Sequence, residues 1–169
     1  MKIVIVNGYS GCGKDTFVQT VGEMVSVKSY SVADTAKEMA YEEHDLDDSC
    51  KGTDDEPFYR QFLLNRVNKL IENGTIEEEI REVIKRATEQ NFDILFIHNR
   101  DNTAANLIHD KLGLECVTLW LQRDSVDPSN DQDAGVAYHH YDVKVNLPDK
   151  DSEEYDKVVH KVVSFILNN

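Results

Sequence analysis

The stretch VNGYSGCGKDTF, residues 6–17, decides how this chain folds. It begins at the end of KIVIV (2–6), a run of β-branched residues that predicts a buried parallel strand. The residues that follow, KDTFVQTVGEMV (14–25), carry apolar side chains at helical spacing and predict a helix. The glycines between the two therefore form a tight connection from a strand to a helix, and Lys14 comes directly after the last glycine.

The glycine spacing of this connection matches that of a phosphate-binding loop. Glycines let the backbone turn so that its N–H groups converge on one point, and the start of a helix adds partial positive charge. The pattern G-x-x-x-x-G-K between a strand and a helix is typical of nucleotide sites, where its lysine reaches the β- and γ-phosphates. We therefore predict an ATP phosphate-binding site made of Gly8, Tyr9, Ser10, Gly11, Cys12, Gly13, Lys14, Asp15 and Thr16.

Two side chains of this loop are open to more than one interpretation. Asp15 stands where most such loops have the Ser or Thr that ligates magnesium. Its carboxylate either ligates Mg²⁺, directly or through water, or stabilises the first helical turn through the helix dipole. Asp15 and Thr16 together are the candidate metal site. The thiol of Cys12 either has a pKa lowered by the anion-binding loop or is a small filler.

Strands and helices alternate along the rest of the chain. Short apolar runs predict further strands at 27–33, 92–99, 114–122 and 141–147. Helical periodicity predicts helices at about 34–43, 58–73, 75–91, 101–113 and 152–167, with Gly74 and Gly113 as stop signals. This order predicts an α/β fold of the three-layer P-loop NTPase type, a parallel five-stranded sheet with helices on both faces.

Length and composition predict one domain and exclude several classes of partner. The 169 residues suit a single domain, 1–169, with a helical insert at about 34–74, an exposed acidic loop at 42–57 and a lid loop at about 124–140. The net charge of -14 argues against nucleic acid and anionic membranes as partners. Three cysteines without a C-x-x-C pair indicate neither a disulfide framework nor a zinc site, so we expect a cytoplasmic protein. Nothing in the sequence indicates an oligomeric state.

Several segments resemble P-loop nucleoside monophosphate kinases. The loop reads G-x-x-G-x-G-K-x-T, as in adenylate kinase and its relatives, and GKDT resembles the deoxynucleoside monophosphate kinase and phosphomevalonate kinase branches. Further segments are similar, in order, to the deoxynucleotide branch: YSVADTAKEMA (30–40), YRQFL (59–63), FIHNRD (96–101), LWLQRD (119–124) and SNDQDAGVAYHHYDVKVNL (129–147). The resemblance implies ATP-dependent phosphoryl transfer to a (deoxy)nucleoside monophosphate, with ATP and Mg²⁺ bound and nucleotides as substrates.

The same resemblance implies roles for three arginines and two residues of the helical insert. Arg100 follows a buried strand at the sheet edge where ligands bind, and with Arg60 would hold the acceptor phosphate. Arg123 would lie near the donor phosphates or the adenine; Lys14, Arg100 and Arg123 are the catalytic candidates. Asp34 and Lys37 would contact the acceptor. The alternatives are structural: a salt bridge for Arg100, a solvated charge for Arg60 and a helix N-cap for Asp34.

Two departures from the family pattern keep other functions open. His98 stands where many P-loop enzymes have an Asp that orients magnesium. Residues 124–140 contain no Lys or Arg, although the lid of adenylate-kinase-like enzymes supplies cations to the transferred phosphoryl group. The alternatives are a P-loop kinase for another small phosphorylated metabolite and a nucleotide-binding regulatory module with weak or no catalysis.

Overall fold

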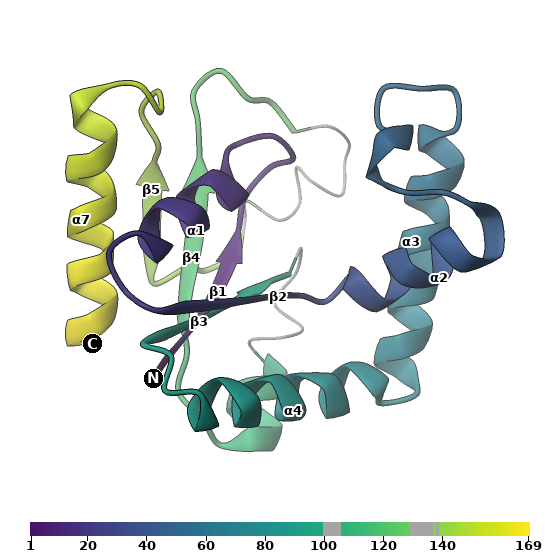
Figure 1. Ribbon diagram of the computed structural model, residues 1–169, viewed down its shortest axis with the longest axis horizontal. Helices are drawn as coiled ribbons and strands as arrows, with labels where there is room; N and C mark the ends of the chain where they lie inside the picture. The colour runs from purple at the N-terminus through teal and green to yellow at the C-terminus, as the bar shows by residue number, and fades with distance from the viewer. Residues whose placement is uncertain (100–105, 129–136, 138) are drawn as a thin grey trace. The chain divides into compact units, whose positions relative to one another are not determined.

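The computed structural model describes residues 1–99, 106–128, 137 and 139–169 (Figure 1). The chain forms two compact units: the first combines Met1–Tyr30 with Ile84–Asn169, and the second is Ser31–Val83. The boundaries between them therefore fall inside the strand predicted at 27–33 and inside the helix predicted at 75–91.

The sheet has five strands in the order β2-β3-β1-β4-β5. The strands are β1 (Lys2–Asn7), β2 (Val27–Ser31), β3 (Ile94–His98), β4 (Val117–Gln122) and β5 (Val143–Asn146). β1 is parallel to both of its neighbours: Val6 pairs with His98 of β3, and Asn7 pairs with Trp120 of β4. The carboxyl ends of these strands thus share one edge of the sheet, where open α/β sheets bind ligands.

Helices cover both faces of the sheet, as the alternation of strands and helices predicts. In the first unit the helices are α1 (Lys14–Gly22), the π-helical turn η2 (Leu107–Lys111) and α7 (Glu153–Asn168). The second unit contains α2 (Asp34–His44) and α3 (Glu56–Glu72), and α4 (Thr75–Glu89) runs from the second unit into the first. The predicted α/β fold with a parallel five-stranded sheet is confirmed. Gly74 and Gly113, with φ of 82° and 63°, end the helices before them as predicted.

The main core lies between the sheet and the helices α1 and α7. Phe17 of α1 meets Phe96 of β3 edge-on, and both side chains are fully buried. Val159 and Ile166 extend the same cluster along α7. Each large apolar side chain buried here contributes about 1.5–3 kcal/mol, and together they hold α1, and with it the loop before α1, against the sheet.

The second unit has a small core of its own. Ala40 of α2 and Tyr59 of α3 are buried together with Cys50 from the short 3₁₀-helix η1 (Asp48–Cys50). The prediction of an exposed loop at 42–57 is therefore wrong in part, because α2 continues to His44 and Cys50 packs inward. The prediction missed Cys50 because this residue is a single small apolar side chain within an acidic stretch.

Candidate functional site

The predicted phosphate loop, residues 8–14, connects β1 to α1 at the carboxyl edge of the sheet. A Cβ atom on Gly8 would lie 2.2 Å from the carbonyl oxygen of Leu121 in β4, so only glycine lets the loop pass this close to the strand. Gly13 precedes α1 with φ of 97°, and no side chain among the described residues caps the helix start. The strand, the tight connection and the helix predicted at 2–25 are all present.

Lys14 folds back across this loop. Its Nζ atom donates hydrogen bonds to the carbonyl oxygens of Gly8 (2.7 Å) and Tyr9 (2.8 Å). The Tyr9 carbonyl also accepts a bond of 3.2 Å from the N–H of Cys12. The loop backbone thus places a positive charge beside the start of α1, where the partial charge of the helix has the same sign.

Cys12 is a packing residue of the loop. Its side chain is fully buried, and its thiol donates to the Leu121 carbonyl at 3.3 Å. Burial raises the pKa of Cys12, although the charges of Lys14 and Arg123 act in the opposite direction. The hypothesis of a lowered pKa is therefore wrong, because desolvation of the thiolate outweighs the nearby cations. The alternative, a small filler, is confirmed.

Arg123 follows β4 and lies against the same loop. A Cβ atom on Gly13 would be 3.4 Å from the Nη2 atom of Arg123, so the guanidinium group faces the last glycine of the loop. Nη2 is also 3.4 Å from the carbonyl oxygen of Pro148, to which it donates. The buried Nε has no hydrogen-bond partner in the described part of the chain. The structure thus brings two of the catalytic candidates, Lys14 and Arg123, to one loop.

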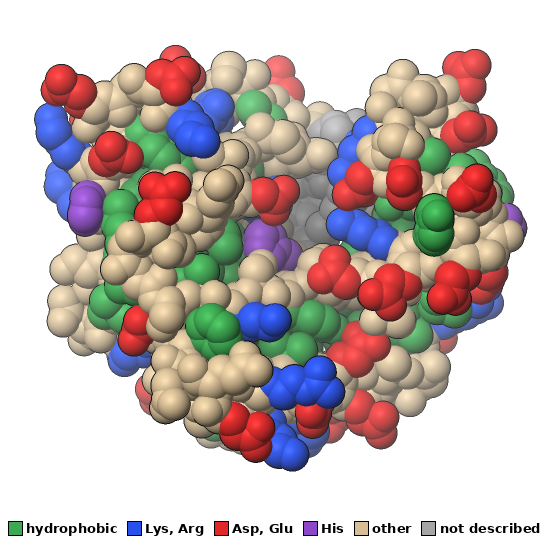
Figure 2. Space-filling model, viewed as in Figure 1, with side chains coloured by type: hydrophobic (Ala, Val, Ile, Leu, Met, Phe, Trp, Pro, Cys, Tyr) green, Lys and Arg blue, Asp and Glu red, His purple; other side chains and the backbone are tan. Residues whose placement is uncertain are grey.

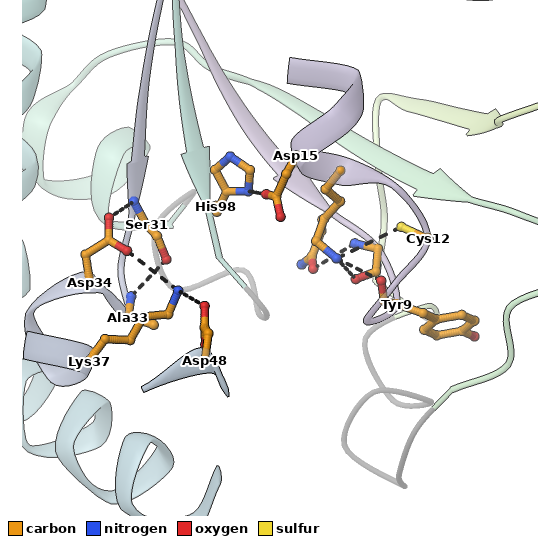
Figure 3. A network of polar contacts seen from close by, with 12 residues as sticks. Tyr9, Cys12, Asp15, Ser31, Ala33, Asp34, Lys37, Asp48 and His98 are labelled. Atoms are coloured by element: carbon orange, nitrogen blue, oxygen red, sulfur yellow. Dashed lines mark hydrogen bonds and ion pairs between the residues drawn. The ribbon is translucent and has the colours of Figure 1, made fainter. Parts of the chain in front are cut away.

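Asp15 and Thr16 lie in the first turn of α1. The side chain of Asp15 is 98% exposed, and its Oδ1 atom is 3.8 Å from Nδ1 of His98, which is 15% exposed. Figure 3 shows the two side chains pointing toward each other from α1 and β3. Thr16 is half-buried, and its carbonyl oxygen accepts from the hydroxyl of Thr20 at 3.0 Å. The sequence singled out Asp15 and His98 separately but did not predict this pair.

No group of three or more His, Cys, Asp or Glu that would hold a metal ion exists in the described ranges. Magnesium bound with a nucleotide needs no such group, because Mg²⁺ keeps several waters and takes one or two protein carboxylates besides phosphate oxygens. An exposed carboxylate in the first turn after the phosphate loop meets that need. Asp15 therefore fits as a single protein ligand, whereas a cage built from protein groups alone is absent from these ranges.

In the second unit, the predicted acceptor residues engage neighbouring charges. Nζ of Lys37 is 3.4 Å from Asp48 and 3.9 Å from Asp34 (Figure 3). Asp34 is the first residue of α2, and its carboxylate accepts from the N–H of Ser31 at 3.1 Å. Its predicted role as N-cap is wrong, since Ala33 occupies that position. Asp34 instead closes the turn before the helix.

Arg60 lies on the first turns of α3 and is paired within the same helix. Its Nη2 and Nε atoms are 2.5 Å and 2.6 Å from Oε1 of Glu56, one turn earlier. Glu56 also accepts from the N–H of Gly52 at 2.6 Å, so its carboxylate is held in place. Arg60 is therefore paired with Glu56 and is not a free solvated charge. An anionic ligand would have to compete with Glu56 for it.

Asp48 interacts with three polar side chains, which the sequence did not predict. It accepts from the buried hydroxyl of Tyr59 at 3.1 Å and pairs with Lys51 at 3.0 Å as well as with Lys37. Partial burial raises the pKa of Asp48, but the hydrogen bond from Lys51 and the charge of Lys37 bring it below its usual value. In the sequence, Tyr59 could have indicated that a polar group lies nearby, because a tyrosine at a core position of a helix needs a partner for its hydroxyl.

Arg100 lies outside the described residues, and so do Asp131 and Asp133 of the predicted lid loop. Asp124, at the start of that loop, accepts from the side-chain amide of Asn146 at 2.8 Å. Figure 2 shows Asp and Glu side chains spread over the visible face with Lys and Arg among them, in keeping with the net charge of -14.

Comparison with known proteins gives matches to solved structures only. No family model matches the chain, and no curated protein is significantly similar to it in sequence. A dephospho-CoA kinase from Campylobacter jejuni superposes with a TM-score of 0.56 at 15% identity, over 99% of this chain and 98% of the kinase. A protein from Thermus thermophilus superposes with a TM-score of 0.55 at 13% identity, over 99% and 98% of the two chains. The chain has the fold of P-loop kinases.

At these identities the similarity extends to the arrangement of strands and helices and not to the residues that choose a substrate. None of the helices described is both long and apolar enough to cross a bilayer.

Proposed function

We propose that this protein is an ATP-dependent kinase that transfers a phosphoryl group to a small phosphorylated acceptor. The observation that carries the proposal is the loop from Gly8 to Lys14, whose ammonium group is held by two loop carbonyls beside the uncapped start of α1. The positive charge of Arg123 at Gly13 supports the same assignment. These groups concentrate positive potential at one point of an otherwise acidic protein, which is what a triphosphate requires.

Different groups of the loop would bind different parts of the donor nucleotide. Its backbone N–H groups and Lys14 would hold the β- and γ-phosphates, and the Thr16 hydroxyl would contact a phosphate oxygen. Mg²⁺ bound with the nucleotide would offset phosphate charge, and Asp15 is the residue that would hold it. Phosphoryl transfer needs positioning and charge stabilisation rather than a nucleophilic side chain, so Lys14 and Arg123 are sufficient candidates on the donor side.

For the acceptor we propose a nucleoside monophosphate, most simply a deoxynucleotide. The support is the ordered resemblance of five segments of the chain to that branch of kinases. Asp34, Lys37, Arg60 and Arg100 are the proposed acceptor residues. Because Lys37 and Arg60 are paired with Asp48 and Glu56, an acceptor phosphate would exchange with these carboxylates rather than meet free cations.

A second candidate, a nucleotide-binding regulatory module, is favoured by the same ion pairs. If Lys37 and Arg60 remain with their carboxylates, the second unit supplies no charge to an acceptor and the loop binds nucleotide without turnover. In both cases the partners we propose are nucleotides, with neither nucleic acid nor membrane involved. The free cysteines, two of them buried, suit a reducing compartment, and we propose the cytoplasm.

The test combines nucleotide binding with a panel of acceptors. Calorimetry with MgATP would measure binding, and ADP release would be followed with each NMP, each dNMP, phosphomevalonate and dephospho-CoA. We expect ADP formation that depends on one acceptor class, and loss of nucleotide affinity in Lys14→Ala but not in the exposed control Lys161→Ala. MgATP binding without turnover on any acceptor would favour the regulatory module, and absence of MgATP binding would refute both.

A further inference from the structure

A cluster of aromatic side chains packs against the phosphate loop. The ring of Tyr9 meets the indole of Trp120 edge-on, with 5.1 Å between ring centroids and an angle of 87° between the planes. Trp120 also packs on Tyr141, with 5.3 Å between centroids. Trp120 and Tyr141 are only 2% and 6% exposed, and Ala137 lies against the same cluster. The loop is thus attached to a buried aromatic surface.

The central ring of this cluster has a fixed orientation. The Nε1–H group of Trp120 donates to the side-chain oxygen of Gln122 at 3.1 Å, and its backbone lies in β4 opposite Asn7 of β1. Asn7 is the residue before the loop, and its side-chain oxygen accepts from the N–H of Gly8 at 3.0 Å. Trp120 therefore offers a rigid surface directly beside the point where the loop leaves the sheet.

Tyr9 joins this surface to the chemistry of the loop. Its side chain packs on Trp120, while its main-chain carbonyl accepts from Nζ of Lys14 and from the N–H of Cys12. The side chain and the carbonyl belong to one residue, so a shift of the ring shifts the backbone that orients the ammonium group. A loop with glycines at positions 8, 11 and 13 has high backbone entropy, and an anchor on its second residue restricts it before a ligand arrives.

We propose that Tyr9 is a positioning residue of the phosphate loop: its ring, packed on Trp120, holds the carbonyl that orients Lys14. Its effect on nucleotide affinity rests on the proposed function, whereas its effect on the order of the loop does not. The role belongs to the ring and its edge-on contact, so phenylalanine substitutes for tyrosine and smaller side chains do not. The backbone contribution of Tyr9 to phosphate binding, predicted from the loop pattern, is separate from this role of its side chain.

The experiment compares Tyr9→Ala, Tyr9→Leu and Tyr9→Phe with Tyr141→Ala. The last variant removes a ring from the same tryptophan without altering a loop residue. It reports the effect of weakened packing around Trp120, together with the loss of the contact between the Tyr141 ring and Nζ of Lys144. We expect Tyr9→Ala and Tyr9→Leu to raise the Kd for MgATP roughly 3- to 10-fold, the size of one aromatic pair, and Tyr9→Phe to change it less than about twofold. Tyr141→Ala should lower the unfolding midpoint with a smaller rise in Kd than Tyr9→Ala.

Two further measurements separate positioning from general stability. Trp120 is the only tryptophan, so its emission should change when MgATP binds the wild type and change less in Tyr9→Ala. Without any ligand, the amide of Cys12, which donates to the Tyr9 carbonyl, should exchange its hydrogen faster in Tyr9→Ala and Tyr9→Leu than in Tyr141→Ala.

Equal effects of Tyr9→Ala and Tyr141→Ala on Kd and on exchange would overturn the proposal. If the wild type does not bind MgATP, the proposed function fails and the exchange rate of Cys12 alone decides: faster exchange in the Tyr9 variants supports the anchor, and unchanged exchange rejects it.

Discussion

The carboxylate of Asp15 lies 3.8 Å from the imidazole of His98, so the first turn of α1 and the end of β3 meet beside the phosphate loop. Both residues depart from the usual P-loop pattern, and the fold puts them face to face. The Asp15 side chain is almost fully exposed, and a contact of a carboxylate in that setting contributes little to stability. Asp15 is consequently able to turn to a metal cation at little cost in free energy.

Asp15→Asn distinguishes the two interpretations of this residue. If Asp15 holds magnesium, the variant should need several-fold more Mg²⁺ for half-maximal activity, since a neutral amide is a weaker ligand for this hard cation. If it only complements the helix dipole, the Mg²⁺ dependence stays unchanged and the free energy of unfolding falls by about 0.3–1 kcal/mol. A magnesium titration of activity and urea unfolding give both answers. Asp110→Asn, which alters the exposed pair with His109, is the matched control.

Gly8 and Gly11 should respond very differently to alanine. A Cβ atom at Gly8 would collide with the backbone oxygen of Leu121 at 2.2 Å, whereas at Gly11 nothing lies within 4 Å. Gly11→Ala then carries only the conformational penalty of its φ of 79°, about 1 kcal/mol. Gly8→Ala should lower the free energy of unfolding by more than twice that amount, because β4 or the loop must move. Equal losses in urea unfolding would mean that the loop does not pass β4 as closely as described.

Local sequence patterns predicted the fold and the connection at residues 8–14, but not the pairs of Asp15 with His98 and of Asp48 with Tyr59. Glycine spacing and a β-branched run are short-range signals, and they predicted β1, the loop and α1. The pair of Asp15 with His98 depends on the register of β1 against β3, which joins residues about ninety positions apart. Asp48 was hidden because carboxylates in an acidic stretch look alike until the fold places the Tyr59 hydroxyl beside one of them.

Arg123 should matter for the donor nucleotide more than for stability. Its guanidinium group faces Gly13, within reach of a ligand held by the loop. We expect Arg123→Ala to raise the Kd for MgATP about tenfold, the effect of losing one hydrogen bond from a charged group, and Arg123→Lys to recover part of it. Calorimetry measures both. Arg81→Ala, which removes the same charge from an exposed pair on α4, is the control, and an equal effect there would assign the loss to net charge alone.

The pair of Arg60 with Glu56 allows a direct test of acceptor binding. If Arg60 binds the acceptor phosphate, Arg60→Ala should raise the acceptor KM about tenfold and leave the KM for ATP unchanged. Glu56→Gln removes the competing charge and should lower the acceptor KM or leave it as it is. Steady-state kinetics with both substrates varied would show the difference. A rise in acceptor KM in both variants would instead assign the ion pair to the structure of α3.

The hydrogen bond from the Tyr59 hydroxyl to the Asp48 carboxylate should make the stability of the second unit depend on pH. Because the pKa of Asp48 is lowered in the folded protein, its contribution is complete above its unfolded value of about 3.9 and is lost as the pH falls through the folded value. In Asp48→Asn the free energy of unfolding should therefore fall less steeply than in the wild type as the pH drops below about 4. Asp54→Asn, at an exposed position of the same stretch, should show the same dependence on pH as the wild type. Tyr59→Phe should cost about 1 kcal/mol at pH 7, since the buried ring stays and one hydrogen bond is removed. Urea unfolding between pH 7 and about pH 2.5 tests both, and identical acid slopes for Asp48→Asn and wild type would contradict the role of Asp48.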